Sequence, residues 1–265
     1  MKTVRFASLA IGLSAMVAAM PAQAHFQLIY TPDPIIDRPG EVPLRLIFWH
    51  PMENGAVMDM GVPEEFFVQH REDRIDLTDR LAPITFTGVE NTAAAYSATL
   101  PVRRSGDYVL ALTPAPYFEE SEDVYIQQIT TAYLNRSTIP TDWMLSLDLP
   151  AEIMPMTKPT NVVVGSTFTG QVLSEGQPVS GVEIEVEFMA AEPDLDLNAP
   201  QPATASPLPG GTIVVMSDAN GVFTFGIPRA GYWGFAALGV GPDTEHEGKE
   251  LSQDAVIWIR AHDFD

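Results

Sequence analysis

Short runs in which apolar and polar residues alternate recur along this chain, and they constrain its fold more than any other feature. In the segment VEIEVEF, residues 182–188, four apolar side chains fall on one side of an extended chain and three glutamates on the other. Extended strands repeat every two residues, whereas helices repeat every 3.6. Similar runs stand at residues 44–49, 168–173, 212–217, 221–228 and 255–260. The sequence therefore predicts strands, with the glutamates of 182–188 facing solvent.

Turn residues separate these runs and favour an all-β protein. The chain has 23 prolines and 19 glycines among its 265 residues, spread between the apolar runs. The segment 123–134, DVYIQQITTAYL, fits a helical spacing in part, but its Thr, Tyr and Ile content favours a strand. We predict two β-sandwich domains with little helix. The domains are expected at residues 25–150 and 151–265, divided near 149–161, where three prolines disfavour regular structure.

The second predicted domain has a compact strand-and-turn pattern. It contains two strands joined by a turn, an Asn-Gly turn at Asn220, further strands and the closing run 255–260. This pattern looks like the immunoglobulin-type modules found in carboxypeptidase-regulatory-like proteins. The acidic and then Pro-rich segment 191–211 is expected to be a mobile loop between two strands. Asp194 and Asp196 in it offer oxygen donors to a hard cation, although a solvated acidic loop needs no ligand.

The first 24 residues have the organisation of a secretory signal peptide. Lys2 and Arg5 precede an apolar run at 6–20, and Ala22-Gln23-Ala24 has the form that signal peptidase reads. Cleavage after Ala24 would make His25 the first residue, with a free α-amine. No later stretch approaches the roughly 18 apolar residues of a membrane span, so we expect a periplasmic protein that is not embedded in a membrane.

Charge and cysteine content exclude several classes of function. The formal net charge is −21, which opposes binding to nucleic acid or to anionic lipid. The absence of cysteine excludes disulfides and thiolate metal sites. None of the common catalytic motifs is present, including G-x-S-x-G, H-E-x-x-H and phosphate-binding glycine loops. We therefore expect no enzymatic activity.

Two histidines and three methionines form the candidate metal site. His25 would offer an imidazole and an α-amine from one residue, which together chelate a metal. His50 follows the apolar run 44–49 and so stands at the end of a strand. The loop after it contributes thioether sulfur from Met52, Met58 and Met60. Imidazole suits nickel, cobalt, copper or zinc, and thioethers favour Cu(I). If both histidines bind one ion, the strand after His25 must lie beside the end of 44–49.

The other three histidines carry no functional prediction. His70 is expected at an exposed hairpin tip, His246 in a charged loop and His262 near the end of the chain.

Several segments, taken in order, resemble a bacterial exported family. They are AHFQLIYTP, HPMENGAVMDM, GDYVLALTPAPYFEESEDVYI, AEIMPMTKP, STFTGQVLSEGQPVSGVEIEVEF and SDANGVFTFGIPRAGYWGFAAL. The family is labelled nickel-uptake or periplasmic cobalt-transport component-like protein. The resemblance implies a β-rich exported protein that handles a transition metal, with His25 and His50 in matching positions. Tyr117, Glu122 and Asp123 fall in the family's Pro-Tyr and acidic stretch. This chain has Gln128 where the resemblance implies a histidine.

The sequence is compatible with two functions from different classes. The first is a periplasmic protein that binds nickel, cobalt or copper and assists its uptake by a membrane metal transporter. The alternative is a metal-free β-sandwich interaction module that docks on a membrane or periplasmic partner. A copper oxidase is a third reading, which no feature of the sequence supports directly. The metal content of the purified protein separates the first two.

Overall fold

The computed structural model of the chain describes residues 25–208 and 212–264. The predicted signal peptide, residues 1–24, lies outside the described residues. The chain is all-β, as predicted, with strands in two large sheets and two smaller ones. Helical structure in the described part is limited to the 3-10 turns η1 (Thr78–Arg80) and η2 (Pro159–Asn161). No helix among the described residues is long and apolar enough to cross a bilayer.

The strands before residue 137 supply a five-stranded sheet and half of a twelve-stranded sheet. The five-stranded sheet consists of β1 (Phe26–Tyr30), β3 (Gly40–Trp49), β8 (Thr92–Val102) and β7 (Ala82–Thr87), with β4 (Val57–Met58) paired to β3. The twelve-stranded sheet takes from this part β11 (Val124–Arg136), β9 (Gly106–Thr113), β5 (Glu65–His70), β6 (Asp73–Asp76), β10 (Tyr117–Glu119) and β2 (Ile35–Ile36).

The strands after residue 150 complete the twelve-stranded sheet and form the two smaller sheets. The twelve-stranded sheet gains β23 (Lys249–His262), β21 (Gly231–Ala237), β16 (Glu183–Phe188), β19 (Ile213–Met216), β13 (Val162–Val163) and β22 (Glu245–His246). The four-stranded sheet contains β12 (Ala151–Pro155), β14 (Thr167–Ser174), β15 (Gln177–Pro178) and β20 (Val222–Gly226). A separate hairpin pairs β17 (Pro193–Asp194) with β18 (Ala199–Pro200).

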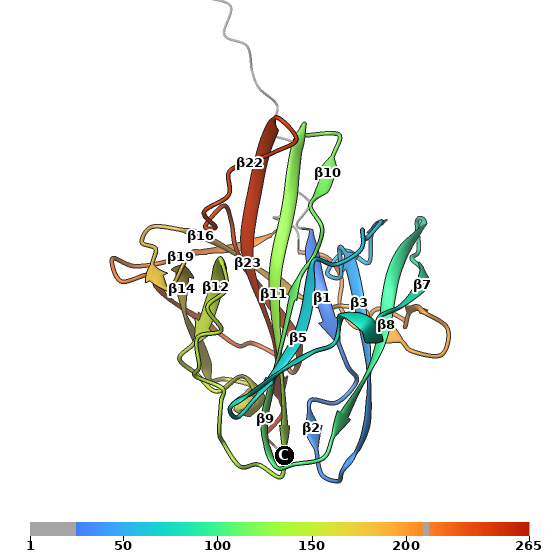
Figure 1. Cartoon of the computed structure of the whole chain (residues 1–265), viewed down its shortest axis with the longest axis vertical. Helices are drawn as coiled ribbons and strands as arrows, with labels where there is room; N and C mark the ends of the chain where they lie inside the picture. The colour runs from blue at the N-terminus through green and yellow to red at the C-terminus, as the bar shows by residue number, and fades with distance from the viewer. Residues whose placement is uncertain (1–24, 209–211, 265) are drawn as a thin grey trace, which may run out of the picture.

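The two long strands β11 and β23 join the two halves of the chain. They pair in parallel from Tyr125 opposite Leu251 to Ala132 opposite Trp258. Figure 1 shows them side by side along the long axis, β11 in green and β23 in red. One sheet therefore runs across the predicted boundary at 150/151, and the division into domains of 25–150 and 151–265 stays a prediction.

Two sandwiches use opposite halves of this long sheet. In the first, Leu44 and Phe48 of the five-stranded sheet pack with Phe66 and Leu110 of β5 and β9. In the second, the four-stranded sheet packs on β16, β21 and β23. Its core includes Phe168, Val172, Ile184, Phe235 and Ile257. Burial of such side chains contributes about 1.5–3 kcal/mol each relative to leaving them exposed.

A third apolar cluster packs the two sandwiches against each other. The outer face of β1 and β3, which carries Phe26, Leu28 and Trp49, contacts Tyr232 and Trp258 of β21 and β23. All five residues of β1 are buried as a result. The start of the described chain is thus enclosed between the sandwiches.

This packing corrects the prediction that the glutamates of 182–188 face solvent. Glu183 is exposed, but Glu185 and Glu187 are buried. The segment after His50 lies over this face of β16, because the backbone N–H of Met52 donates to Oε1 of Glu187 at 3.2 Å. Alternation identified the strand correctly, but it could not show that both of its faces are covered.

Two segments expected to be irregular contain strands. The proline-rich stretch 149–161 includes β12, which pairs with β14 because Pro150, Pro155 and Pro159 lie at its ends or beyond it. The segment 191–208 contains the hairpin β17–β18 and contacts the first sandwich, where Nε of Arg45 donates to Oδ1 of Asn198 at 2.8 Å. Asp194 bonds the backbone N–H groups of Asp196 and Leu197, so its carboxylate shapes the turn.

Candidate functional site

The histidine pair meets at one end of the first sandwich. β1 and β3 are antiparallel, with Phe26 opposite Trp49, so His25 and His50 adjoin just beyond the paired residues. Their ring centroids are 4.4 Å apart, with the ring planes at 54°. The adjacency of these two strands, which the metal hypothesis required, is confirmed.

His50 is buried as a neutral imidazole. Its side chain is enclosed, and Nδ1 lies 3.1 Å from the carbonyl oxygen of Ala56. A carbonyl only accepts hydrogen bonds, so Nδ1 carries the proton and Nε2 keeps its lone pair. Burial, helped by neighbouring His25, lowers the pKa of His50 to about 4. Nε2 is buried without a hydrogen-bond partner among the described residues. Such an atom is costly to leave unsatisfied, by about 1–3 kcal/mol.

His25 faces a carboxylate on β10. Its Nε2 lies 3.2 Å from Oε2 of Glu119, and both side chains are largely buried. Burial acts to raise the pKa of Glu119, but hydrogen bonds from Ser121 and the interaction with His25 outweigh it and lower that pKa. A carboxylate that accepts at Nε2 holds the proton on that nitrogen and makes Nδ1 the basic nitrogen of the neutral ring.

A cleft of about 570 Å³ opens beside the pair, and Met58 and Tyr117 also line it. The three predicted methionines do not gather there. Met58 borders the cleft, whereas Met52 packs in the core of the second sandwich and Met60 in that of the first. The sulfur of Met60 accepts from Nε2 of Gln27 at 3.5 Å. The structure therefore brings together His25, His50 and Met58.

Gln128 positions the start of β1. Its Nε2 donates to the carbonyl oxygen of His25 at 2.7 Å, and its Oε1 accepts from the backbone N–H of Gln27 at 2.8 Å. The amide thus pairs with the backbone of β1 as a neighbouring strand would. Gln128 stands where the resemblance implied a histidine. In this chain its side chain hydrogen-bonds to the backbone of His25, the candidate metal ligand.

Glu119 is the main residue of this site that sequence reasoning missed. It belongs to β10, whose pairing with β11 places Glu119 opposite Val124. The resemblance drew attention to the neighbouring Tyr117 and Glu122, but the many carboxylates of the chain gave Glu119 no distinguishing signal. Across the described residues, no three His, Asp or Glu side chains are arranged to hold a metal.

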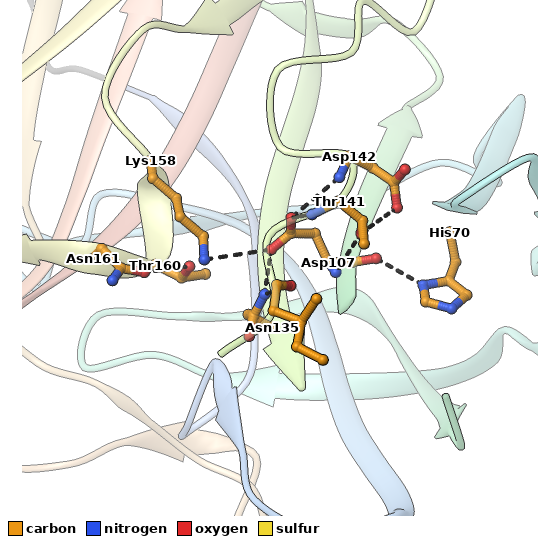
Figure 2. A network of polar contacts seen from close by, with 9 residues as sticks. His70, Asp107, Asn135, Thr141, Asp142, Lys158, Thr160 and Asn161 are labelled. Atoms are coloured by element: carbon orange, nitrogen blue, oxygen red, sulfur yellow. Dashed lines mark hydrogen bonds and ion pairs between the residues drawn. The ribbon is translucent and has the colours of Figure 1, made fainter. Parts of the chain in front are cut away.

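His70 differs from its predicted place at an exposed hairpin tip. It is buried at the end of β5, where its ring stacks on Tyr108 at 4.0 Å and Nδ1 lies 2.8 Å from the carbonyl oxygen of Asp107. Figure 2 shows the network around Asp107, whose carboxylate accepts from the backbone N–H groups of Thr141 and Asp142. Aromatic stacking and this network give His70 a structural role.

The two remaining histidines lie on β22 and β23. His246 packs edge-on against Tyr125, with ring centroids 4.7 Å apart. His262 lies opposite Val163 of β13. Neither lines the cleft of the histidine pair.

The fold and this site define an all-β protein with a histidine pair at the end of one sandwich. The chain belongs to the family described as Domain of unknown function (DUF4198), whose model matches residues 22–241. A comparison with curated proteins finds no match.

Among solved structures, the chain is similar to domains of intimin, of the adhesin InvE and of titin. The D0-D1 domain of intimin shares 14% identity over 86% of this chain and 95% of that one, with a TM-score of 0.23. The Yersinia pseudotuberculosis adhesin InvE shares 13% over 87% and 58%, with a TM-score of 0.24. A chimeric titin Z1Z2-Z1Z2 tandem shares 12% over 91% and 100%, with a TM-score of 0.22.

Proposed function

We propose that this chain is an exported periplasmic protein that binds a divalent transition metal at His25 and His50 and assists its uptake. The observation that carries the proposal is Nε2 of His50, a basic nitrogen buried without a hydrogen-bond partner among the described residues, on a ring 4.4 Å from that of His25. A nitrogen lone pair that accepts no hydrogen bond suits a metal ion that prefers nitrogen ligands, such as nickel, cobalt or copper.

The α-amine of His25 is the proposed third donor. It exists only if the chain is cut after Ala24, and residues 1–24 lie outside the described part. An amine and Nδ1 of the same histidine close a chelate ring on a metal. Glu119 supports this choice of nitrogen, because a carboxylate on Nε2 orients a histidine for metal binding through the other one. Among the described methionines, Met58 is the one that lines the cleft beside the histidine pair, and it is the proposed soft donor.

The proposed role is non-enzymatic, and its partner is a membrane metal transporter. Neutral His50 can bind metal at neutral pH without releasing a proton, because its pKa is lowered to about 4. The alternative proposal is a metal-free interaction module that uses the sandwich surfaces. It leaves unexplained why the unsatisfied nitrogen of His50 lies on a ring next to that of His25, and we therefore rank it second.

Titration calorimetry with Ni(II), Co(II) and Cu(II) tests the metal proposal. The protein of residues 25–265 is compared with His50→Ala and with a form that has one alanine added before His25. We expect tight binding by the first and at least tenfold weaker binding by both altered forms. Equal binding by all three, or binding weaker than about 10 μM (roughly −7 kcal/mol) by the first, would favour the metal-free module.

The start of the exported protein is a separate prediction. Expression with residues 1–24 attached should yield periplasmic protein whose intact mass equals that of residues 25–265. A different first residue would remove the amine from the proposed site while leaving both imidazoles in place.

A further inference from the structure

A second cleft, of about 360 Å³, lies on the other side of His25 and is strongly acidic. We call it the acidic cleft. It is bordered by the ends of β11, β16 and β23, and the residues relevant here are His25, Glu122, Gln128, Glu185, Glu250 and Asp254. None of its lining residues is a lysine or arginine. A cleft lined by charges of one sign concentrates the counter-ion inside it.

Glu185 shows that this cleft is more than a group of acidic surface residues. It stands on β16 opposite Ala236, and only 8% of it is exposed. It borders the cleft, yet its carboxylate has no hydrogen bond or ion pair with any described residue. A buried carboxylate is normally paired, because removing a charge from water is costly. Burial and the nearby charge of Asp254 raise the pKa of Glu185 to about 7.

Asp254 provides a second carboxylate, which is held in a fixed orientation. Its Oδ1 accepts from the backbone N–H of Gly239 at 2.8 Å and from the hydroxyl of Ser252 at 2.6 Å. Its Oδ2 accepts a longer bond, 3.3 Å, from Gln128. The residue is 2% exposed, and its pKa is raised to about 6 by burial. All of these partners are uncharged, so Asp254 has no cationic hydrogen-bond partner among the described residues.

We infer that the acidic cleft binds a divalent cation that keeps its water shell, through Glu185 and Asp254. Among the described residues, no three His, Asp or Glu side chains are grouped so that they could hold a bare ion. The volume suits a hydrated ion, because it equals the space of roughly twelve waters at about 30 Å³ each, against six in an octahedral shell. Carboxylates would then accept hydrogen bonds from the bound waters.

This site goes beyond the proposed nitrogen-donor site and differs from it in chemistry. His25 borders both clefts, so a hydrated ion held here would stand next to the proposed ligands. A role as a waiting position for metal rests on the proposed function. Binding of the hydrated ion itself needs only the carboxylates.

Hexaamminecobalt(III) tests the inference, because its six ammine ligands do not exchange and imidazole cannot displace them. Calorimetry would compare residues 25–265 with Glu185→Gln and with Glu72→Gln, which removes one exposed charge in the turn between β5 and β6. We expect one saturable site in the unaltered protein. Glu185→Gln should weaken it at least tenfold, and Glu72→Gln less than twofold. His50→Ala should leave it unchanged.

The inference is overturned if the unaltered protein has no saturable site, or if Glu185→Gln and Glu72→Gln weaken binding equally. Equal loss would mean diffuse attraction to the acidic surface. Backbone amide shifts of the unaltered protein give a readout that does not depend on folding of a variant. Shifts confined to residues such as Leu238, Gly239 and Ser252 support the site, and shifts spread over the surface reject it.

The result also separates this inference from the proposed function. Binding of hexaamminecobalt(III) without tight binding of Ni(II), Co(II) or Cu(II) would leave the acidic cleft in place and reject the nitrogen-donor site. Tight binding of those three ions without any binding of hexaamminecobalt(III) would support the nitrogen-donor site and reject the site in the acidic cleft.

Discussion

An oxygen acceptor contacts one ring nitrogen of each histidine of the pair, and this nitrogen differs between the two rings. The carbonyl oxygen of Ala56 holds the proton of His50 on Nδ1, whereas the carboxylate of Glu119 holds that of His25 on Nε2. The basic nitrogens are therefore Nε2 of His50 and Nδ1 of His25. Single-residue contacts thus decide which nitrogen of each ring can donate to a metal.

Glu119→Gln should weaken binding of Ni(II) by about tenfold, the lower end of the 10–100-fold range for outer-shell partners of metal ligands. The amide keeps the size of the side chain but loses the charge that supports a metal-bound imidazole. Calorimetry at pH 7.5 measures the change. The control is Glu120→Gln, which removes the same charge from the adjacent exposed residue. An equal loss in the two variants would reduce the role of Glu119 to general electrostatics.

Glu185→Gln should stabilise the folded protein in a pH-dependent manner. Between about pH 4.5 and pH 7 the folded state keeps a proton on Glu185 that the unfolded state has lost, so this residue makes stability fall as pH rises. Because the amide of glutamine does not ionise, Glu185→Gln removes this loss of stability at higher pH. The gain should be near zero at pH 4.5 and reach at most about 3 kcal/mol at pH 8, since each unit of pKa shift corresponds to about 1.36 kcal/mol.

Urea denaturation at the two pH values measures this gain, with Glu72→Gln as the exposed control. If the gain of Glu185→Gln does not increase with pH, the carboxylate is not held in the unfavourable environment that the acidic cleft requires.

At the scale of elements, β1 depends on side chains of the long sheet as much as on its partner strand. Its backbone pairs with β3 on one side. On the opposite side of β1, the backbone N–H of Gln27 donates to the side chain of Gln128. The carbonyl oxygen of Gln27 accepts from the indole of Trp258 at 2.9 Å. Side chains of β11 and β23 thus replace a further strand and fix the place of His25.

Gln128→Ala should lower the free energy of unfolding by about 1–3 kcal/mol, the usual result of leaving a buried donor without its acceptor. The N–H of Gln27 would lose its partner, and so would the carbonyl oxygen of His25. Urea denaturation measures the loss, and Gln201→Ala at an exposed position is the control. A loss below about 0.5 kcal/mol would show that β1 is held mainly by β3.

The parts of this arrangement that the sequence predicted are those that depend on local pattern. Period-two runs gave the strands, and the position of His50 after an apolar run placed it at a strand end beside His25. Glu119, Glu185 and Asp254 were not predicted, because their roles depend on pairings between strands far apart in the chain. Glu185 was even assigned to solvent, since alternation does not reveal a second covered face.

At the scale of the whole molecule, the two sandwiches share a sheet and a core. The parallel pairing of β11 with β23 crosses the predicted domain boundary. Ile129 and Val109 of the first half pack in the same cluster as Phe235 and Ile257 of the second. A third cluster joins the outer face of β1 and β3 to β21 and β23. Neither half can bury its own apolar surface without the other.

The last prediction follows from this shared core: residues 25–265 should unfold in one cooperative transition. Calorimetric and van't Hoff enthalpies should agree, as in a two-state transition. Residues 25–150 expressed alone should lack a cooperative transition, because β11 would expose the edge that pairs with β23 and the apolar residues beneath it. Two separate transitions in the full chain, or cooperative unfolding of the fragment, would show that the sandwiches fold independently and that the boundary near 150 divides true domains.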